Sequence, residues 1–190
     1  MAHGSDEKYA LNLDDIIAFP DAAHMPVLPP EPGESWILLM EIMEDLSFMG
    51  RPVFSVKDIT QTSFVVAMYT SNPFHDARNF RIGHTLCITS LRPHHFLDGH
   101  TGFRIEDPNT IEILPVSLVR LREINVALRK RSDDGYIQKC IKCNNATEMR
   151  CGVCRSLYCT KECQRMDWRE HKRQCPVLKT LHRWNRTDWG

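Results

Sequence analysis

Residues 140–175 read CIKCNNATEMRCGVCRSLYCTKECQRMDWREHKRQC and hold seven of the eight cysteines of this 190-residue chain. Two Cys-x2-Cys pairs stand early in the stretch, and a His-x3-Cys pair closes it. Two intervening residues let a tight backbone turn present both sulfur atoms to one metal ion, and structural zinc takes four thiolate or imidazole ligands. Eight ligands therefore predict two structural zinc ions, held by Cys140, Cys143, Cys151, Cys154, Cys159, Cys163, His171 and Cys175.

Disulfide bonds are the alternative for so many cysteines. Seven cysteines cannot all pair, a histidine stands in register with them, and Met1–Asp15 lacks the basic start and apolar run of a secretory signal. We therefore expect an intracellular protein, in nucleus or cytoplasm, whose thiols stay reduced. The longest apolar run, Trp36–Met40, is too short to cross a membrane, so no membrane association is expected.

The stretch from Tyr158 to Gln164 and the run from Asp167 to Lys172, together with the eight ligand positions, resemble a MYND-type zinc finger. The resemblance covers 36 of the 190 residues. It implies interleaved metal sites, whereas the spacing alone leaves a sequential pairing open. In the implied arrangement one zinc is held by Cys140, Cys143, Cys159 and Cys163, and the other by Cys151, Cys154, His171 and Cys175.

The resemblance also implies a function, because MYND fingers are protein-interaction modules and some hold proline-rich peptides of the pattern Pro-x-Leu-x-Pro beside the finger's helix. The matching positions here are Gln164 and Trp168, four residues apart. An amide can hydrogen-bond the peptide, and an aromatic face suits the rigid extended conformation of proline-rich chains. The alternative is that Trp168 only packs over the zinc loops.

Residues 1–34 form a proline-rich segment with few large apolar side chains, and we expect an extended N-terminal arm there. Within it, Pro26, Leu28 and Pro30 match the Pro-x-Leu-x-Pro pattern. Arm and finger could therefore recognise each other, within one chain or between two chains. The alternative is a plain proline-rich linker.

Residues 35–116 alternate apolar and polar side chains over short segments, as half-buried strands do. Phe54 with Val56 and Phe103 with Ile105 are examples. Five or six such strands without helices between them predict a small β-barrel. A partly open OB-like barrel is the preferred prediction, although another small barrel would fit almost as well.

Helices are expected on the carboxyl side of the barrel, so the predicted fold class is α+β. Residues 117–133 are predicted as a connecting amphipathic helix with Ser117 as N-cap, closed by three basic residues, Arg129–Arg131, at a solvated end. Its apolar positions are Leu118, Leu121, Ile124 and Leu128. A second helix is predicted over Lys161–Gln174, and residues 176–190 are expected to be a C-terminal tail.

Two other functions compete with that of a non-enzymatic adaptor. A protein methyltransferase relative is disfavoured, because the SET domain that accompanies this finger in such enzymes needs well over a hundred further residues, and no cofactor motif is found here. Nucleic-acid binding through the barrel is the stronger alternative. Residues 35–116 hold 6 basic and 9 acidic side chains, which disfavours it. Its test residues would be Arg78, Arg81, Arg92 and Arg104.

Other polar and aromatic residues have simpler interpretations. Cys87, between two apolar residues, is predicted to be a buried strand thiol. A histidine group at residues 94, 95 and 100 is expected in a loop and lacks the spacing of a metal site. Trp184 and Trp189 follow the finger and could cover its outer face or reach a partner.

Overall fold

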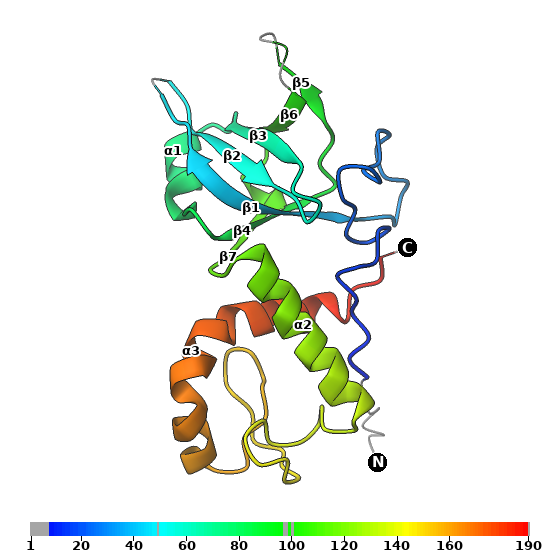
Figure 1. Cartoon of the computed structure of the whole chain (residues 1–190), viewed down its shortest axis with the longest axis vertical. Coiled ribbons are helices and arrows are strands. Elements are labelled where there is room, and N and C mark those ends of the chain that lie inside the picture. The colour runs from blue at the N-terminus through cyan, green and yellow to red at the C-terminus, as the bar shows by residue number, and fades with distance from the viewer. Residues whose placement is uncertain (1–7, 49, 97–98, 100, 190) are drawn as a thin grey trace. The chain divides into compact units, whose positions relative to one another are not determined.

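The computed structural model describes residues 8–48, 50–96, 99 and 101–189 (Figure 1). Contacts divide the chain into two compact units. One, the barrel unit, holds Leu13–Arg120 with the last residues from Asp188 onward, and the other, the finger unit, holds the segment ending at Asn12 together with Leu121–Thr187. Each unit is described separately below.

The barrel unit is built on one seven-stranded sheet in the order β5-β6-β3-β2-β1-β4-β7. All pairs are antiparallel except the parallel pair of β3 with β6. The strands are β1 (Ile37–Asp45), β2 (Val53–Lys57), β3 (Ser63–Met68), β4 (Thr85–Thr89), β5 (His94–His95), β6 (Thr101–Ile105) and β7 (Ile111–Leu114). Short helical turns lie at α1 (Pro73–Asp76), η1 (Ala77–Asn79) and η2 (Pro108–Thr110).

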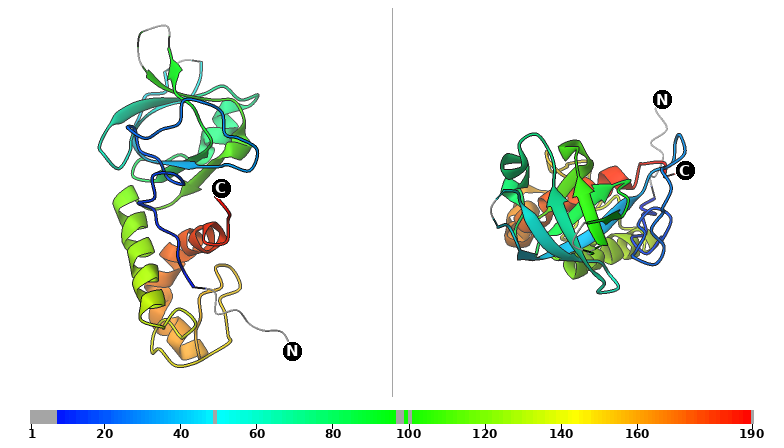
Figure 2. Two further views of the ribbon diagram at one scale, coloured as in Figure 1. Left: turned by 90° about the vertical axis from the view of Figure 1, so that its right-hand side faces the viewer. Right: turned by 90° about the horizontal axis from the view of Figure 1, so that it is seen from above.

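The sheet curls around its core (Figure 2). Strand β5 lies at one edge of the strand order and β4 near the other edge, so a short connection between them requires the two edges to approach each other. Only residues 90–93 separate these two strands, yet β4 pairs with β1 and β5 with β6. Among the described residues no strand pair closes the ring. The predicted small OB-like barrel is thus confirmed as an open barrel, with β7 as an added strand beside β4.

Alternate residues of the strands form the core of this barrel, as the period-two pattern predicted. The buried residues packed together include Phe54 and Val56 of β2, Leu86 of β4, and Phe103 and Ile105 of β6. The phenylalanines at positions 54 and 103 are therefore core residues and offer no stacking surface to a ligand. Cys87 is also buried, as predicted, on β4.

The structure corrects the predicted loop around the histidines, since His94 and His95 form strand β5 against β6. Position 100 lies outside the described residues. Sequence alternation could not show a two-residue strand. Within the described chain, these histidines belong to no group able to hold a metal ion.

The two long helices are α2 (Leu118–Asp133) and α3 (Lys161–Trp184). Ser117 caps α2 as predicted, because its Oγ accepts a hydrogen bond of 3.2 Å from the Arg120 N–H. Its four predicted apolar positions, Leu118, Leu121, Ile124 and Leu128, are all buried. Helix α3 continues past Pro176 and bends along its length, so residues 176–184 are helical and not the predicted tail (Figure 1).

The proline-rich arm is divided between the two units. Residues 8–36 contain no helix or strand. In the finger unit, Asn125 of α2 donates hydrogen bonds to the Tyr9 hydroxyl at 2.9 Å and the Leu11 carbonyl at 3.1 Å. In the barrel unit, Phe19 packs against Trp189 with ring centroids 5.2 Å apart. Within the described residues, no helix is long and apolar enough to cross a membrane.

Candidate metal centre

The eight predicted ligands gather into two groups of four. In the first group, Cys143 Sγ lies 3.3 Å from Cys159 Sγ and 3.8 Å from Cys163 Sγ, and the last two are 3.5 Å apart. Cys140 completes this group, and all four sulfur atoms lie within 4.8 Å of one another.

The second group combines three thiols with an imidazole. His171 Nε2 faces Cys151 Sγ at 3.3 Å and Cys154 Sγ at 3.8 Å, and Cys175 Sγ lies 3.9 Å from Cys151 Sγ. The four ligand atoms again lie within 4.8 Å of one another. The structure thus brings the ligands together in the interleaved grouping and not in the sequential one.

These separations fit tetrahedral zinc. With Zn–S bonds of about 2.3 Å, two sulfur ligands of one tetrahedron are about 3.8 Å apart. A disulfide needs an S–S distance of about 2.05 Å, and all eight cysteines are free. The four-cysteine group and the group of three cysteines with a histidine therefore bind two zinc ions.

The two Cys-x2-Cys pairs are held by turns of the same design. The Cys140 N–H donates to the Asn145 carbonyl at 2.9 Å, and the Cys151 N–H donates to the Ser156 carbonyl at 2.8 Å. The residue after the second cysteine of each turn has a positive φ, 59° at Asn144 and 66° at Arg155. This left-handed residue turns the chain back, so both sulfurs of a pair point to one site.

The surroundings of the thiols favour binding of a cation. Burial raises the pKa of the first thiol in each turn, but backbone N–H groups that donate to its sulfur outweigh burial and lower the pKa of Cys140 and of Cys151 to about 6. Contact with the Cys143 thiol raises the pKa of Cys159 to about 12, and burial raises the pKa of Cys175 to about 12. The four thiols of the first group, or the three of the second, lose their protons together only beside a positive ion.

Helix α3 supplies three of the ligands. Thr160 caps its start, accepting a hydrogen bond of 3.1 Å from the Cys163 N–H on its Oγ1. His171 and Cys175 are four positions apart, so both lie on one face of the helix. The Tyr158 hydroxyl donates to Asp167 at 2.6 Å, and its ring meets the His171 ring edge-on at 5.4 Å. Tyr158 therefore ties the second turn to the helix.

The predicted peptide-binding residues lie one turn apart on α3. The Trp168 side chain is 51% exposed, and its ring centroid lies 6.0 Å from that of His171. Gln164 is half-buried. Trp168 thus rests against the zinc-bearing histidine and still presents about half of its surface to solvent.

Comparison with solved structures gives weak likenesses. The chain matches the structure of Schizosaccharomyces pombe Pot1pC bound to ssDNA with a TM-score of 0.37 and 10% identity, over 56% of this chain and 94% of that one. It matches a replication protein A heterotrimer bound to ssDNA with a TM-score of 0.33 and 9% identity, over 54% of this chain and 73% of that one.

Comparison with known sequences locates the similarity in the finger. The chain is 40% identical over 55 residues to SET domain-containing protein 14 of Caenorhabditis elegans, and 40% identical over 52 residues to Dauer abnormal formation protein 25 of the same organism. The matches cover 28% and 27% of this chain, and 13% of each relative. The MYND finger family model matches residues 140–175, the segment that carries all eight ligands. Residues 140–175 are thus a two-zinc MYND finger.

Proposed function

We propose that this protein is a non-enzymatic adaptor whose MYND finger binds a short proline-rich segment of a protein partner. The observation that carries the proposal is the half-exposed Trp168 ring on α3, held against His171 and preceded one turn back by Gln164. A large aromatic side chain fixed on a zinc-stabilised element is a rigid platform, and docking to it costs little conformational entropy.

The metal sites support a role in binding and not in catalysis. Each group already supplies four protein ligands. A catalytic zinc needs an open position for water or substrate, which a filled set of four protein ligands does not leave. The zinc ions then serve to hold α3 and its exposed face in place.

The proposal is tested by a ¹⁵N NMR titration of the full zinc-loaded chain with a peptide of residues 22–33, which contains the Pro-x-Leu-x-Pro pattern, and with a scrambled control. The full chain is used because the finger unit also includes α2 and the segment around Tyr9. We expect saturable shifts at Gln164 and Trp168, and about tenfold or greater weakening by Trp168→Ala, as for an interface hot spot.

Met166→Ala is the matched control, because Met166 is an exposed apolar residue on the same helix at 63% exposure. Its substitution should leave the affinity within about twofold of wild type. Equal shifts with the scrambled peptide, or equal losses in the two variants, would refute the peptide-binding site.

Self-recognition between arm and finger follows from the same proposal. Leu28, the central residue of the arm's own motif, is 73% exposed, and Val27 beside it is 76% exposed. The arm is therefore accessible to a finger. If it is used, Leu28→Asp should raise the affinity of an added peptide or reduce dimer formation in analytical ultracentrifugation. If neither the peptide affinity nor the dimer formation changed, the arm would act only as a linker.

Single-stranded nucleic-acid binding by the barrel remains the second candidate, because one observation favours it. The guanidinium groups of Arg51 and Arg104 lie 3.7 Å and 4.2 Å from the centre of the Tyr69 ring. Two cations beside one aromatic ring suit a strand of nucleic acid. Against it, Arg104 already pairs with the Glu106 carboxylate at 2.5 Å. Arg78 and Arg81 also donate to nearby carbonyls at 2.8 Å or less.

Retention on single-stranded DNA at low and high salt distinguishes this candidate. Binding through the barrel should weaken with salt and should be lost in Arg51→Gln/Arg104→Gln. An exposed control is Arg120→Gln, which lies in the same unit but outside the Tyr69 cluster. Absence of salt-dependent retention would remove nucleic acid as a ligand of the barrel.

A further inference from the structure

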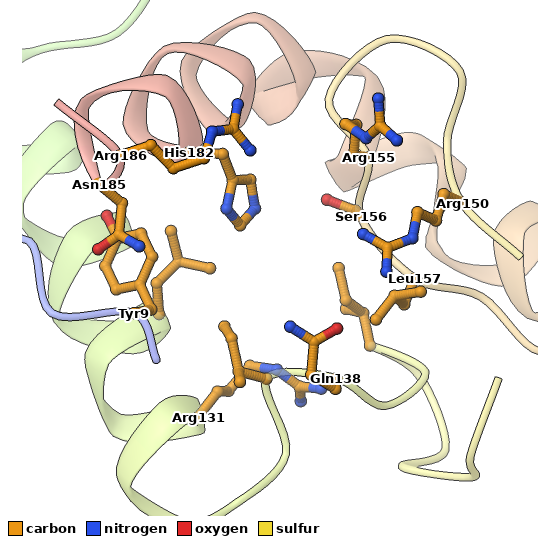
Figure 3. A pocket seen from close by; sticks show the side chains of 13 residues that line it. Tyr9, Arg131, Gln138, Arg150, Arg155, Ser156, Leu157, His182, Asn185 and Arg186 are labelled. Carbon is orange, nitrogen blue, oxygen red and sulfur yellow. The ribbon is translucent and has the colours of Figure 1, made fainter. Parts of the chain in front are cut away.

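A cavity of about 70 Å³ lies in the finger unit, and no metal ligand lines it. Its walls come from the end of α2, residues 137–141, the second metal-binding turn and the last part of α3 (Figure 3). One water needs about 10–15 Å³ of such space, so the cavity holds roughly five water-sized groups. A phosphate group, with one phosphorus and four oxygen atoms, is of this size.

The lining of the cavity is strongly cationic. It includes Arg131, Arg150, Arg155 and Arg186 with His182, and no aspartate or glutamate. Within the described part of the chain, no carboxylate pairs with the arginines at 150, 155 and 186. The two neighbouring zinc–thiolate groups are net anionic, but no carboxylate lines the hollow, and four arginines around it create a potential that attracts anions.

Donor groups point into this space from several sides. Figure 3 shows the Arg150 guanidinium, the His182 imidazole and the Gln138 amide directed toward the centre, with the Ser156 hydroxyl at the wall. Arg131 lies at one side, where its Nη2 already donates to a backbone carbonyl at 3.0 Å. The cavity therefore offers guanidinium, imidazole and amide groups to one bound anion, whereas the Ser156 hydroxyl already pairs with the Cys154 sulfur at 3.1 Å.

The conformation of Arg155 is a second indication that these arginines serve a ligand. The equivalent residue of the first metal-binding turn is Asn144, and asparagine tolerates positive φ better than longer side chains do. An arginine at φ 66° costs backbone energy that an asparagine or glycine would reduce. The cost is explained if its guanidinium is used at the rim of the cavity.

We propose that this cavity binds a phosphate monoester. Arginine forks match phosphate oxygens with paired hydrogen bonds, and a monoester carries a charge of about −1.5 to −2 where a carboxylate carries −1. The exposed rim, with Arg150, Arg155 and Arg186, leaves room for the ester substituent to extend into solvent. The ester could be a phosphorylated side chain of a partner or a free phosphorylated molecule, and its binding is independent of the peptide site at Trp168.

The test follows the arginine Nε–Hε and backbone signals of the full zinc-loaded chain in ¹⁵N spectra during titration with O-phosphoserine. We expect saturable shifts at Arg150, Arg155 and Arg186 with a dissociation constant of about 1 mM or below. Arg150→Gln/Arg155→Gln should weaken binding about tenfold or more. Arg169→Gln, an exposed arginine of α3 outside the cavity, should bind as wild type does.

Further ligands separate the possible sources of the phosphate. Tighter binding of a phosphoserine peptide than of O-phosphoserine identifies a protein source, and equal or weaker binding of the peptide identifies a free phosphorylated molecule. The proposal would be overturned by shifts that grow linearly without saturating, or by an affinity for dimethyl phosphate equal to that for O-phosphoserine. It would also be overturned if Arg169→Gln weakened binding as much as Arg150→Gln/Arg155→Gln does. Binding of two zinc ions per chain verifies that each variant is folded. If the double variant loses zinc, the single variant Arg186→Gln replaces it in the titration.

Discussion

At the scale of single residues, Arg131 shows how one side chain can position a metal-binding turn. Its Nη2 donates to the Tyr136 carbonyl at 3.0 Å and to the Lys139 and Cys140 carbonyls at 3.4 Å. Its Nη1 donates to the Asn144 side chain at 3.1 Å. The guanidinium therefore fixes the segment that leads into the first turn and the turn itself.

Replacing Arg131 should accordingly destabilise the finger unit. We expect Arg131→Met to lower the free energy of unfolding by about 1.5–3 kcal/mol, since the hydrogen bonds that a charged group donates to this segment are lost. The Tyr136 and Cys140 carbonyls keep their backbone partners, the N–H groups of Lys139 and Asn144 at 3.0 Å. Arg131→Lys should restore only part of this, because an ammonium group lacks the planar fork. The measurement is urea unfolding of the zinc-loaded chain.

Lys130→Met is the control for this substitution, since Lys130 is the exposed neighbour of Arg131 on α2. Surface changes of this kind stay within about 0.5 kcal/mol. Similar losses in both variants would mean that the bonds of Arg131 contribute nothing specific.

The same residue marks where sequence reasoning stops. The metal ligands could be predicted because cysteine and histidine are chemically distinctive and their spacing is local. Arg129–Arg131 were predicted to close the helix at a solvated end, and Lys130 and Arg131 do lie in its last turn, with Lys130 exposed. The bonds of the half-buried Arg131 were missed because its partners are mainly backbone carbonyls, which every residue has. Only the folded turn places the carbonyls of Tyr136, Lys139 and Cys140 around one guanidinium.

At the scale of elements, α3 departs most from its predicted extent. A proline inside a helix costs about 3 kcal/mol, so Pro176 indicated an end to the helix. The helix nevertheless continues to Trp184, because Val177, Leu178, Leu181 and Trp184 are buried, and each large apolar side chain contributes about 1.5–3 kcal/mol. The sheet shows the same limit, since alternation predicted five or six of its seven strands but neither the two-residue β5 nor the parallel pairing of β3 with β6.

The second part of α3 should therefore stabilise the finger unit through its apolar face. Leu181 is fully buried, and Leu181→Ala should lower the free energy of unfolding by about 2–5 kcal/mol because it removes contacts and leaves a cavity. Thermal and urea unfolding with zinc present measure this loss. Lys179→Ala, an exposed change on the same stretch, should remain within about 0.5 kcal/mol. An equally small effect of both changes would show that residues 177–184 are dispensable for stability.

At the scale of the whole molecule, the two units depend on different sources of stability. The barrel unit has a cluster of buried apolar residues drawn from strands β1 to β4, β6 and the short η1 turn. The segment of residues 140–160 in the finger unit contains no regular helix or strand, and its bridges are single pairs at Lys139–Ala146 and Arg150–Leu157. Metal ligation must replace an apolar core there, and structural zinc in small finger peptides contributes roughly 10–16 kcal/mol.

Removal of zinc should consequently unfold one unit before the other. With a strong chelator, we expect backbone hydrogen exchange to become fast in residues 140–175 and to stay slow in β1, β2 and β4. Mass spectrometry of peptides measures this exchange. The Cys154→Ser variant should also show faster hydrogen exchange in residues 140–175, and it should bind less than two zinc ions per chain. The Cys87→Ala variant changes a buried thiol outside both metal groups and should still bind two zinc ions. Loss of protection in β1 and β4 at the same chelator concentration as in the finger would contradict this division, and would mean that the barrel core needs the zinc-bound finger to fold.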